Sequence, residues 1–202
     1  MNYQYSVEAD WSTLHRPTWT KILQRVNPES ELHFLEIGSF EGRSSTWFAD
    51  NYLHHPSSTI TCIDTWEGGE EVSRLNLSYN FELIRQNFIH NVSVSKYPHK
   101  FKTFVGSSLQ YLPKLVAEGC QYDFVYLDGS HTARDVFYDL ALSYLMLKPL
   151  GVIVFDDYLN EMATDNVLLR VKPAVDAFLQ IFYNDVKFVE TNTRQAFLVK
   201  RP

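Results

Sequence analysis

Short runs of apolar residues alternate along the chain with longer stretches in which apolar residues recur every three or four positions. The short runs predict buried β-strands, and the longer stretches predict amphipathic helices. Strands are expected at residues 32–37, 59–64, 101–105, 124–127 and 152–155. Because helical stretches separate these runs, the pattern favours a parallel sheet with helices on both faces.

The helices are expected between those strands and after the last of them. Apolar side chains share one helical face in residues 43–53, 77–92, 108–116, 133–145 and 175–182. Pro113 is expected to kink the third of these helices or to fall in its first turn, and Pro149 is expected to end the fourth. Thr132 and Asp135 resemble a capping pair at the start of the fourth helix.

Two further strands are expected at the end of the chain, at residues 186–190 and 196–200. No long helix separates them, so they should pair as an antiparallel hairpin. The pattern shows no internal repeat, which favours a single domain over residues 1–202. Residues 1–30 are expected to form a helical segment that covers the substrate site.

Composition excludes several classes of protein. The 14 Phe, 12 Tyr and 4 Trp residues need a core, so the chain is not disordered. A formal net charge of −6 makes nucleic acid and anionic membranes poor partners. The two cysteines cannot form a disulfide framework, no apolar run is long enough to span a membrane, and the first residues do not resemble a signal peptide. A cytoplasmic location is therefore expected.

Glycine or aspartate stands at the carboxyl end of each of the first five strands. These residues are Gly38, Asp64, Gly106, Asp128 and Asp156. In an open α/β sheet, ligands bind outside the carboxyl ends of the strands. This recurrence predicts a ligand site at that edge of the sheet.

The first loop runs from Glu36 to Ser44 and contains Gly38 and Gly42. It is not the G-x-G-x-x-G fingerprint of dinucleotide-binding proteins, because Phe40 stands where the second glycine belongs. Taken alone, the loop is either a ligand-binding turn or a tight connection from strand to helix. Asp64 follows Gly38 by 26 positions, and an acidic residue there can bind both ribose hydroxyls.

These residues carry a resemblance to class I S-adenosylmethionine (SAM)-dependent methyltransferases. The nearest branch is the small O-methyltransferases related to catechol O-methyltransferase and to macrolide-sugar and aminocoumarin O-methyltransferases. The matching motifs are Glu36-x-Gly38-x-x-x-Gly42-x-Ser44, Asp64, Gly106-x-Ser108, Asp128-Gly129-Ser130-His131 and Phe155-Asp156-Asp157-Tyr158. The resemblance covers residues 32–200 and implies a Rossmann-like, doubly wound seven-stranded sheet in the order 3-2-1-4-5-7-6.

The resemblance also implies roles for individual residues. The Gly38 backbone and the Ser44 hydroxyl would hold the methionyl end of SAM, Asp64 its ribose and Ser108 its adenine edge. Asp128 would contact the cofactor, and Glu36 and Gly42 belong to the same glycine motif. Phe40 and Trp66 either pack on the cofactor or belong to the core.

Asp128, Asp156 and Asp157 form a second group. Three carboxylates at neighbouring strand ends repel one another unless a proton or a cation lies between them. Oxygen ligands favour a hard ion such as Mg²⁺, and catechol-type relatives hold Mg²⁺ at these three positions. The alternative is that Asp128 contacts only the cofactor while Asp156 and Asp157 cap the next loop.

His131 lies three residues after Asp128, where catechol-type enzymes carry a lysine base. An imidazole can accept a hydroxyl proton near neutral pH, so His131 is a candidate catalytic base. The alternative is a histidine that only hydrogen-bonds its loop.

The predicted function is SAM-dependent methyl transfer to a hydroxyl oxygen of a small molecule, such as a sugar or natural product. The protein would act without nucleic acid or membrane partners and could form a homo-oligomer. The alternatives are a dinucleotide-dependent oxidoreductase and a cofactor-binding module without catalysis. Residues 1–20, 65–80 and 158–166 are expected to shape the substrate pocket, with Trp11, Trp19, Trp66, Tyr79 and Tyr158 as its aromatic residues.

Overall fold

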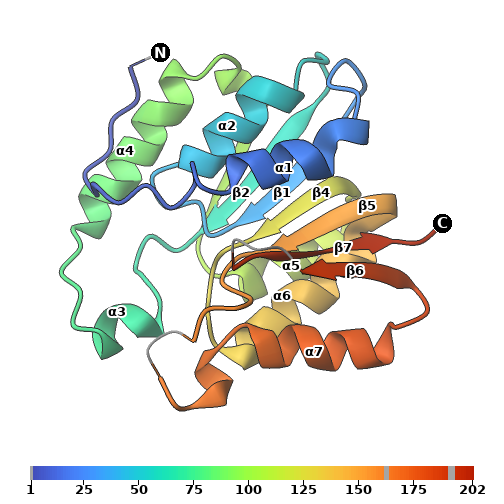
Figure 1. Ribbon diagram of the computed structural model, residues 1–202. Coiled ribbons are helices and arrows are strands. Elements are labelled where there is room, and N and C mark those ends of the chain that lie inside the picture. The colour runs from blue at the N-terminus through green and yellow to red at the C-terminus, as the bar shows by residue number, and fades with distance from the viewer. Residues whose placement is uncertain (1, 162–163, 191–193) are drawn as a thin grey trace.

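The computed structural model describes residues 2–161, 164–190 and 194–202 and shows one seven-stranded sheet between two layers of helices (Figure 1). The strands are β1 His33–Ile37, β2 Thr59–Asp64, β3 Phe101–Val105, β4 Tyr122–Leu127, β5 Leu147–Phe155, β6 Val186–Glu190 and β7 Ala196–Lys200. Their order is β3-β2-β1-β4-β5-β7-β6, which confirms the order that the resemblance implies.

The first five strands are parallel, and β7 runs antiparallel to both β5 and β6. The predicted C-terminal hairpin is therefore confirmed. Registry pairs Ile37 with Ile63 and with Leu127 at the carboxyl ends of β1, β2 and β4. The residues that follow these strands therefore reach the same edge of the sheet.

Seven α-helices and three short 3₁₀ turns occur in the described ranges. The α-helices are α1 Arg16–Ile22, α2 Arg43–Tyr52, α3 Glu70–Arg74, α4 Phe81–Val94, α5 Ser108–Ala117, α6 Ala133–Met146 and α7 Lys172–Ile181. The 3₁₀ turns are η1 Leu23–Arg25, η2 Pro98–Lys100 and η3 Val167–Leu169. None of the helices described is long and apolar enough to cross a membrane.

Two details of the predicted helices differ in the structure, and one is confirmed. The helix expected over residues 77–92 begins only at Phe81, because Asn80 accepts a hydrogen bond from Leu83 N–H and caps the helix there. Pro149 does not end α6, which stops at Met146, and instead lies inside β5. Pro113 lies within α5, and Thr132 caps α6 through the Asp135 N–H as predicted.

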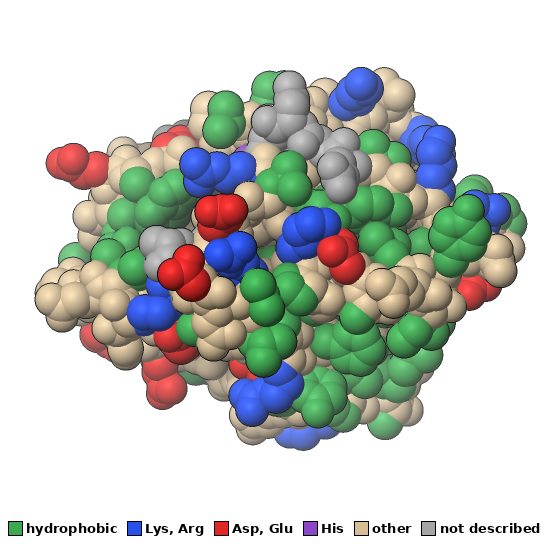
Figure 2. Space-filling view, turned by 60° about the horizontal axis from the view of Figure 1, so that its bottom comes forward, with side chains coloured by type: hydrophobic (Ala, Val, Ile, Leu, Met, Phe, Trp, Pro, Cys, Tyr) green, Lys and Arg blue, Asp and Glu red, His purple; other side chains and the backbone are tan. Residues whose placement is uncertain are grey.

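The core has two parts, one on each face of the sheet. Figure 1 shows α1, α2 and α4 on one face and α5, α6 and α7 on the other. Alternate residues of a strand point to opposite faces, so Phe34 packs with the first layer and Leu35 with the second. Outside these layers, the face seen in Figure 2 mixes apolar, basic and acidic side chains.

The N-terminal residues lie across α2 and α4 in an extended conformation before α1 begins. Gln4 N–H donates to the Asn91 side chain at 2.7 Å, and Ser6 N–H donates to the Glu41 carboxylate at 2.7 Å. The Trp19 indole in α1 is fully buried and donates to the Gln195 side chain at 2.9 Å. These contacts fix the segment between them, residues 10–15, beside the carboxyl ends of the strands.

Candidate functional site

A cavity of about 960 Å³ opens where the carboxyl ends of β1, β2, β4 and β5 meet. Its remaining walls come from residues 106–109 after β3, from α3 with the segment that follows it, and from residues 10–15. A cavity of this size is typical of a small-molecule site. The predicted ligand site at this edge of the sheet is therefore present as a cavity.

Gly38 joins β1 to the loop that forms the floor of the cavity. Its φ is +84°, and a Cβ atom at this position would lie 2.0 Å from the Asp128 carbonyl oxygen. Only glycine tolerates both the left-handed backbone and this approach. Asp128 N–H donates to Ile37 O at 2.8 Å, so the ends of β1 and β4 are in direct backbone contact.

Glu36, Gly42 and Ser44 do not line the cavity, although all three belong to the glycine motif. The Glu36 carboxyl is completely buried under the loop, where the Ser45 hydroxyl donates to it and burial raises its pKa. Ser44 lies beside the same carboxyl. In this arrangement, the Ser44 side chain contacts Glu36 beneath the loop, and its contact with the cofactor stays a prediction.

Asp64 lies at the end of β2 with its carboxylate against the same loop. Oδ2 accepts hydrogen bonds from the Ser39 and Phe40 N–H groups at 2.7 and 2.8 Å. Oδ1 accepts one from Trp66 N–H at 2.7 Å. Burial raises the pKa of Asp64, and four backbone donors, these three and Thr65 N–H, oppose that shift. Asp64 therefore shapes the loop, and it also lines the cavity.

Aromatic residues surround the mouth of the cavity. The Phe40 ring lies 5.9 Å from the Trp11 ring and 6.0 Å from the Tyr79 ring, and all three line the cavity. Trp66 also contributes to the lining, but its indole packs on Phe88 and donates to Phe40 O at 2.8 Å. Among the predicted aromatic residues, Trp11 and Tyr79 thus belong to the pocket, and Trp66 belongs to both pocket and core.

The other two predicted pocket aromatics do not line the cavity. Trp19 is fully buried in the core, and the Tyr158 hydroxyl donates to Asp176 at 2.8 Å. Two residues of the predicted segment 158–166, residues 162 and 163, lie outside the described residues.

Ser108 lines the cavity at the start of α5, next to Ser107, which caps that helix, and its contact with the adenine stays a prediction. The Ser108 hydroxyl also lies against the Asp139 carboxyl in α6. Burial raises the pKa of Asp139 to about 7. Asp139 lines a second, smaller space of about 10 Å³ together with Asp128 and His131, which is about the size of one water molecule.

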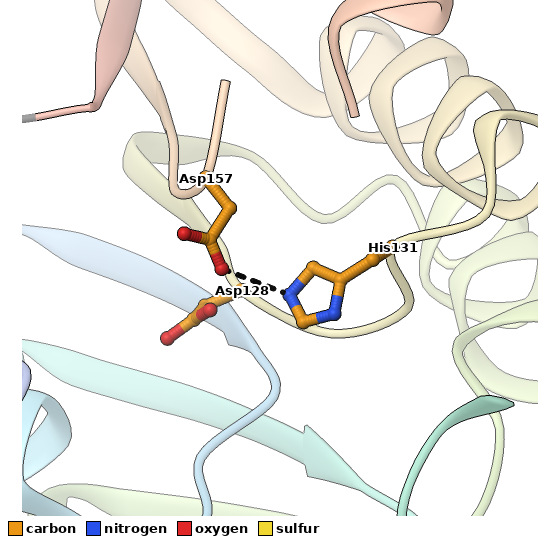
Figure 3. A group of neighbouring side chains, drawn as sticks. All are labelled: Asp128, His131 and Asp157. Atoms are coloured by element: carbon orange, nitrogen blue, oxygen red, sulfur yellow. Dashed lines mark ion pairs between the residues drawn. The ribbon is translucent and has the colours of Figure 1, made fainter. Parts of the chain in front are cut away.

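Asp128, His131 and Asp157 converge at the other end of the cavity (Figure 3). One ligand atom from each lies within 4.8 Å of the others. His131 Nε2 is 3.3 Å from Asp157 Oδ2, and both come from loops that follow neighbouring strands. Burial and the charges of Asp156 and Asp157 raise the pKa of Asp128 well above its usual value.

The cluster contains two members of the predicted metal group, Asp128 and Asp157, together with His131, and metal binding stays a prediction. Asp156 lies outside the cluster because its carboxylate accepts a hydrogen bond from the buried Tyr126 hydroxyl at 2.5 Å. Its other oxygen accepts from Asp157 N–H at 2.8 Å. Burial raises the pKa of Asp156, whereas His131 outweighs the effect of burial on Asp157 and lowers that pKa.

His131 is held from both sides by carboxylates. Its Nδ1 lies 3.5 Å from Glu71 Oε2 in α3, opposite the contact with Asp157. Burial lowers the pKa of His131, but the two carboxylates outweigh it and raise the pKa to about 10. The two carboxylates thus fix the ring between them, and the role of His131 as a base stays a prediction.

Sequence reasoning missed two residues of this end of the cavity. Glu71 follows the two glycines before α3, and no motif marks it. His15 lines the cavity from the N-terminal segment, with Nε2 3.9 Å from Asp156 Oδ1 and with a buried Nδ1 that has no hydrogen-bond partner. The segments that carry both residues were predicted to shape the pocket, but only the fold selects these side chains.

Comparisons with known proteins give relatives in sequence and in structure. Uncharacterized protein R132 of Acanthamoeba polyphaga mimivirus is 26% identical over 162 residues, which cover 79% of this chain and 66% of that protein. The chain thus spans about two thirds of the length of this curated relative.

Solved structures of O-methyltransferases share the fold. TomG from Streptomyces achromogenes, an O-methyltransferase of tomaymycin synthesis solved with SAM, has a TM-score of 0.68 and 18% identity over 98% of this chain and 92% of its own. MycE, a methyltransferase of the mycinamycin pathway solved with Mg and SAH (S-adenosylhomocysteine), has a TM-score of 0.64 and 14% identity over 97% of this chain and 54% of its own.

A family model described as a methyltransferase domain matches residues 35–158, more than half of the chain, from β1 to the loop after β5. The match includes the glycine loop, Asp64 and the cluster of Asp128, His131 and Asp157. The chain therefore belongs to the methyltransferase-domain family, as its motifs predicted.

Proposed function

We propose that this protein transfers a methyl group from SAM to a hydroxyl oxygen of a small molecule. The observation that carries the proposal is a single cavity with two different ends, a glycine loop with Asp64 and Ser108 at one and a charged cluster at the other. The family match and the O-methyltransferases that share the fold support it. In those proteins SAM or SAH is bound, and we transfer that binding to this chain as part of the proposal.

The residues present fit SAM. The cavity of about 960 Å³ is large enough for a nucleoside with an amino-acid arm and an acceptor. Asp64 places a carboxylate, Ser108 a hydroxyl and Phe40 an aromatic ring in the cavity lining, where they can meet the ribose and the adenine. When bound, SAM supplies a methyl group on a positively charged sulfur. The chain's own residues align the two reactants, and alignment alone can accelerate a reaction by several orders of magnitude.

We propose a divalent cation at the charged end of the cavity, held by Asp128, His131 and Asp157. The donor set fits a cation, because two carboxylates face each other and a buried imidazole whose nitrogens lack hydrogen-bond partners. When bound, the cation would orient an acceptor hydroxyl and lower its pKa. The Mg in the related MycE structure is consistent with a cation in this family fold.

We infer that His15, and not His131, accepts the proton of the acceptor hydroxyl. His131 lies between two carboxylates that hold it in place. His15 is the other histidine among the described residues that line the cavity. It faces Asp156, and an imidazole beside a carboxylate is a common arrangement for proton acceptance.

The N-terminal segment encloses the acceptor. Trp11 and His15 both line the cavity, and contacts of Gln4 and Ser6 hold the segment in place. Exclusion of water by this segment would protect the reacting groups. This supports the expectation that residues 1–30 cover the substrate site as part of a single domain. The helical part of this segment is limited to α1 and η1.

A cytoplasmic location and a small-molecule substrate remain parts of the proposal. The location is supported by two free cysteines, Cys62 and Cys120, which suit a reducing compartment. Homo-oligomer formation stays a prediction.

Calorimetry with SAH and with NAD tests the proposal against its first alternative, a dinucleotide-dependent oxidoreductase. We expect SAH to bind and NAD not to bind. NAD binding in the absence of SAH binding would contradict the proposal.

Turnover tests the second alternative, a binding module without catalysis. SAH release from SAM should be measured with a panel of hydroxylated sugars and phenols, with and without a chelator. Release of SAH that depends on one acceptor class supports catalysis. Binding of SAH without turnover on any acceptor would favour the binding module.

A further inference from the structure

Asp128, His131 and Asp157 form a site with two carboxylates and one imidazole, not the three carboxylates expected from the sequence. We propose that this site binds a first-row transition ion, such as Fe²⁺, Co²⁺ or Zn²⁺, in preference to Mg²⁺. The catalytic use of the ion rests on the proposed function, but its binding and its selectivity do not.

The spacing of the three side chains suits a common ion. Two ligands at right angles, each about 2.1 Å from an octahedral ion, lie about 3 Å apart. His131 Nε2 and Asp157 Oδ2 are 3.3 Å apart, and the Asp128 ligand atom lies within 4.8 Å of both. Figure 3 shows the carboxyl group of Asp157 and the ring of His131 turned toward each other above Asp128.

The surroundings of His131 are a second, independent observation. The side chain is only 16% exposed, and neither ring nitrogen has a hydrogen-bond partner. Nε2 faces the cluster, while Nδ1 faces the Glu71 carboxylate at 3.5 Å. Histidines that bind metals usually direct their other ring nitrogen to a carboxylate, which fixes the tautomer and the ring orientation. Glu71 is therefore placed as the orienting carboxylate.

The imidazole decides which ion is preferred. Mg²⁺ prefers oxygen ligands, whereas imidazole nitrogen suits Fe, Co, Ni and Zn. Two carboxylates and one histidine thus provide both oxygen and nitrogen ligands, which favours ions such as Fe²⁺, Co²⁺ and Zn²⁺ that accept both. Three protein ligands leave further positions of the ion open toward the cavity, which is the arrangement of catalytic sites and not of closed structural sites.

The first experiment is calorimetric titration of the full chain with Co²⁺ and with Mg²⁺, in the absence of SAM. We expect Co²⁺ to bind at least about tenfold more tightly than Mg²⁺. His131→Ala should remove at least about tenfold of the Co²⁺ affinity and leave the Mg²⁺ affinity within about threefold. Equal affinity of the unmodified protein for the two ions would overturn the proposal.

The second experiment identifies the ligand directly. Pulsed electron paramagnetic resonance of bound Mn²⁺ detects a nitrogen in its coordination shell. We expect this nitrogen signal in the unmodified protein and its loss in His131→Ala. A nitrogen signal that survives this substitution would overturn the assignment of His131.

Matched variants control both experiments. His54 is another histidine paired with a carboxylate, at 2.9 Å from Glu29, but it lies far along the chain from the cluster, so His54→Ala should change neither readout. Asp157→Asn should abolish binding of both ions, whereas Asp156→Asn, its neighbour outside the cluster, should keep Co²⁺ affinity within about threefold. Loss of Co²⁺ binding in Asp156→Asn with retention in Asp157→Asn would overturn the ligand set.

Circular dichroism melts show whether each variant is folded. If His131→Ala does not fold, His131→Gln replaces it with the same expected loss of the nitrogen signal. SAH calorimetry without metal separates this proposal from the proposed function. SAH binding without Co²⁺ selectivity rejects only the metal site, and Co²⁺ selectivity without SAH binding rejects only the methyl transfer.

Discussion

The two ends of the cavity use their carboxylates in opposite ways. At the glycine-loop end, Glu36 and Asp64 accept hydrogen bonds from nearby hydroxyl and backbone N–H groups. At the charged end, Asp128 and Asp157 meet each other and a histidine whose nitrogens lack hydrogen-bond partners.

This difference separates carboxylates that shape the backbone from carboxylates that are available to a ligand. A buried acidic group that accepts hydrogen bonds from its own loop acts mainly on the conformation of that loop. A buried acidic group beside others of the same charge is stabilised by a proton, a cation or a protonated histidine. Substitutions at the two ends should therefore affect different properties of the protein.

The largest effect is expected where the two ends touch. Gly38→Ala places a Cβ atom 2.0 Å from the Asp128 carbonyl oxygen at a φ of +84°, so it should lower the free energy of unfolding by about 4 kcal/mol or more. Urea denaturation measures the loss. Gly119→Ala is the control, because its φ is +72° but nothing lies within 4 Å, and it should cost only about 1–2 kcal/mol. Equal losses in the two variants would contradict the contact between the ends.

The next effect concerns catalysis at the charged end. His15→Ala should lower kcat about 10²–10⁴-fold, because it removes the base that takes the proton from the substrate hydroxyl. SAH affinity should stay nearly unchanged. Turnover and SAH calorimetry measure the two quantities. His90→Ala, which removes a histidine that contacts Asn2 O on the outside of α4, should change neither. A loss of kcat smaller than about threefold in His15→Ala would reject the role of this residue.

A pH effect is expected from Asp139, which lies beneath the charged end. Its pKa rises from 3.8 to about 7 in the folded protein because of burial. Between these values the folded state keeps a proton that the unfolded state releases, so stability should fall as pH rises from about 4 to 7. Asp139→Asn should remove this fall, which is on the order of 2–4 kcal/mol. Urea midpoints across this pH range measure it.

Asp135 provides the contrast on the same helix. The Arg134, Thr132 and Ser130 side chains outweigh burial and lower the pKa of Asp135. Its contribution to stability is therefore present above the unfolded pKa and is lost as pH falls. Asp135→Asn should change the pH dependence of stability only at acidic pH, below about 4. If Asp139→Asn and Asp135→Asn change the pH dependence of stability in the same direction, the surroundings of the two carboxyl groups are not as different as the structure shows.

A smaller effect is expected on cofactor binding at the glycine-loop end. Asp64→Ala should weaken SAH binding by about 1.5–3 kcal/mol, the range for a hydrogen bond to a charged group. Calorimetry without metal measures it. Asp123→Ala is the control, because Asp123 pairs with Lys148 at 2.9 Å near the opposite end of β4. Unchanged SAH affinity in a folded Asp64→Ala would remove Asp64 from the site.

The smallest effect is expected at the cap of α6. Thr132 accepts a hydrogen bond from Asp135 N–H and fixes the loop that carries His131. Thr132→Ala should cost about 1 kcal/mol of stability, and Thr132→Ser should restore most of it. Thermal melts measure both. Identical melting of the Ala and Ser variants would show that the cap does not stabilise this loop.

The sequence by itself determined the strands, their ends and the family. Apolar runs predicted all seven strands, most clearly the central ones, because a strand buried between two helix layers needs apolar residues on both of its faces. Gly38, Asp64 and Asp128 stand directly after these runs, so their placement at one edge follows from the parallel order. The helix boundary at Phe81 and the extension of β5 through Pro149 were not predicted, since local capping and sheet pairing decide them.

Only the tertiary structure decided which charged side chains meet. Asp156 and Asp157 are identical neighbours in the sequence, yet one contacts Tyr126 and the other His131. Asp157 has a φ of +53°, a left-handed conformation that side-chain sequence patterns do not reveal. Glu71 and His15 reach the same end from segments far away in the chain. Sequence spacing fixes where a strand ends, but the backbone angles and the packing of distant segments fix the direction of each side chain beyond that end.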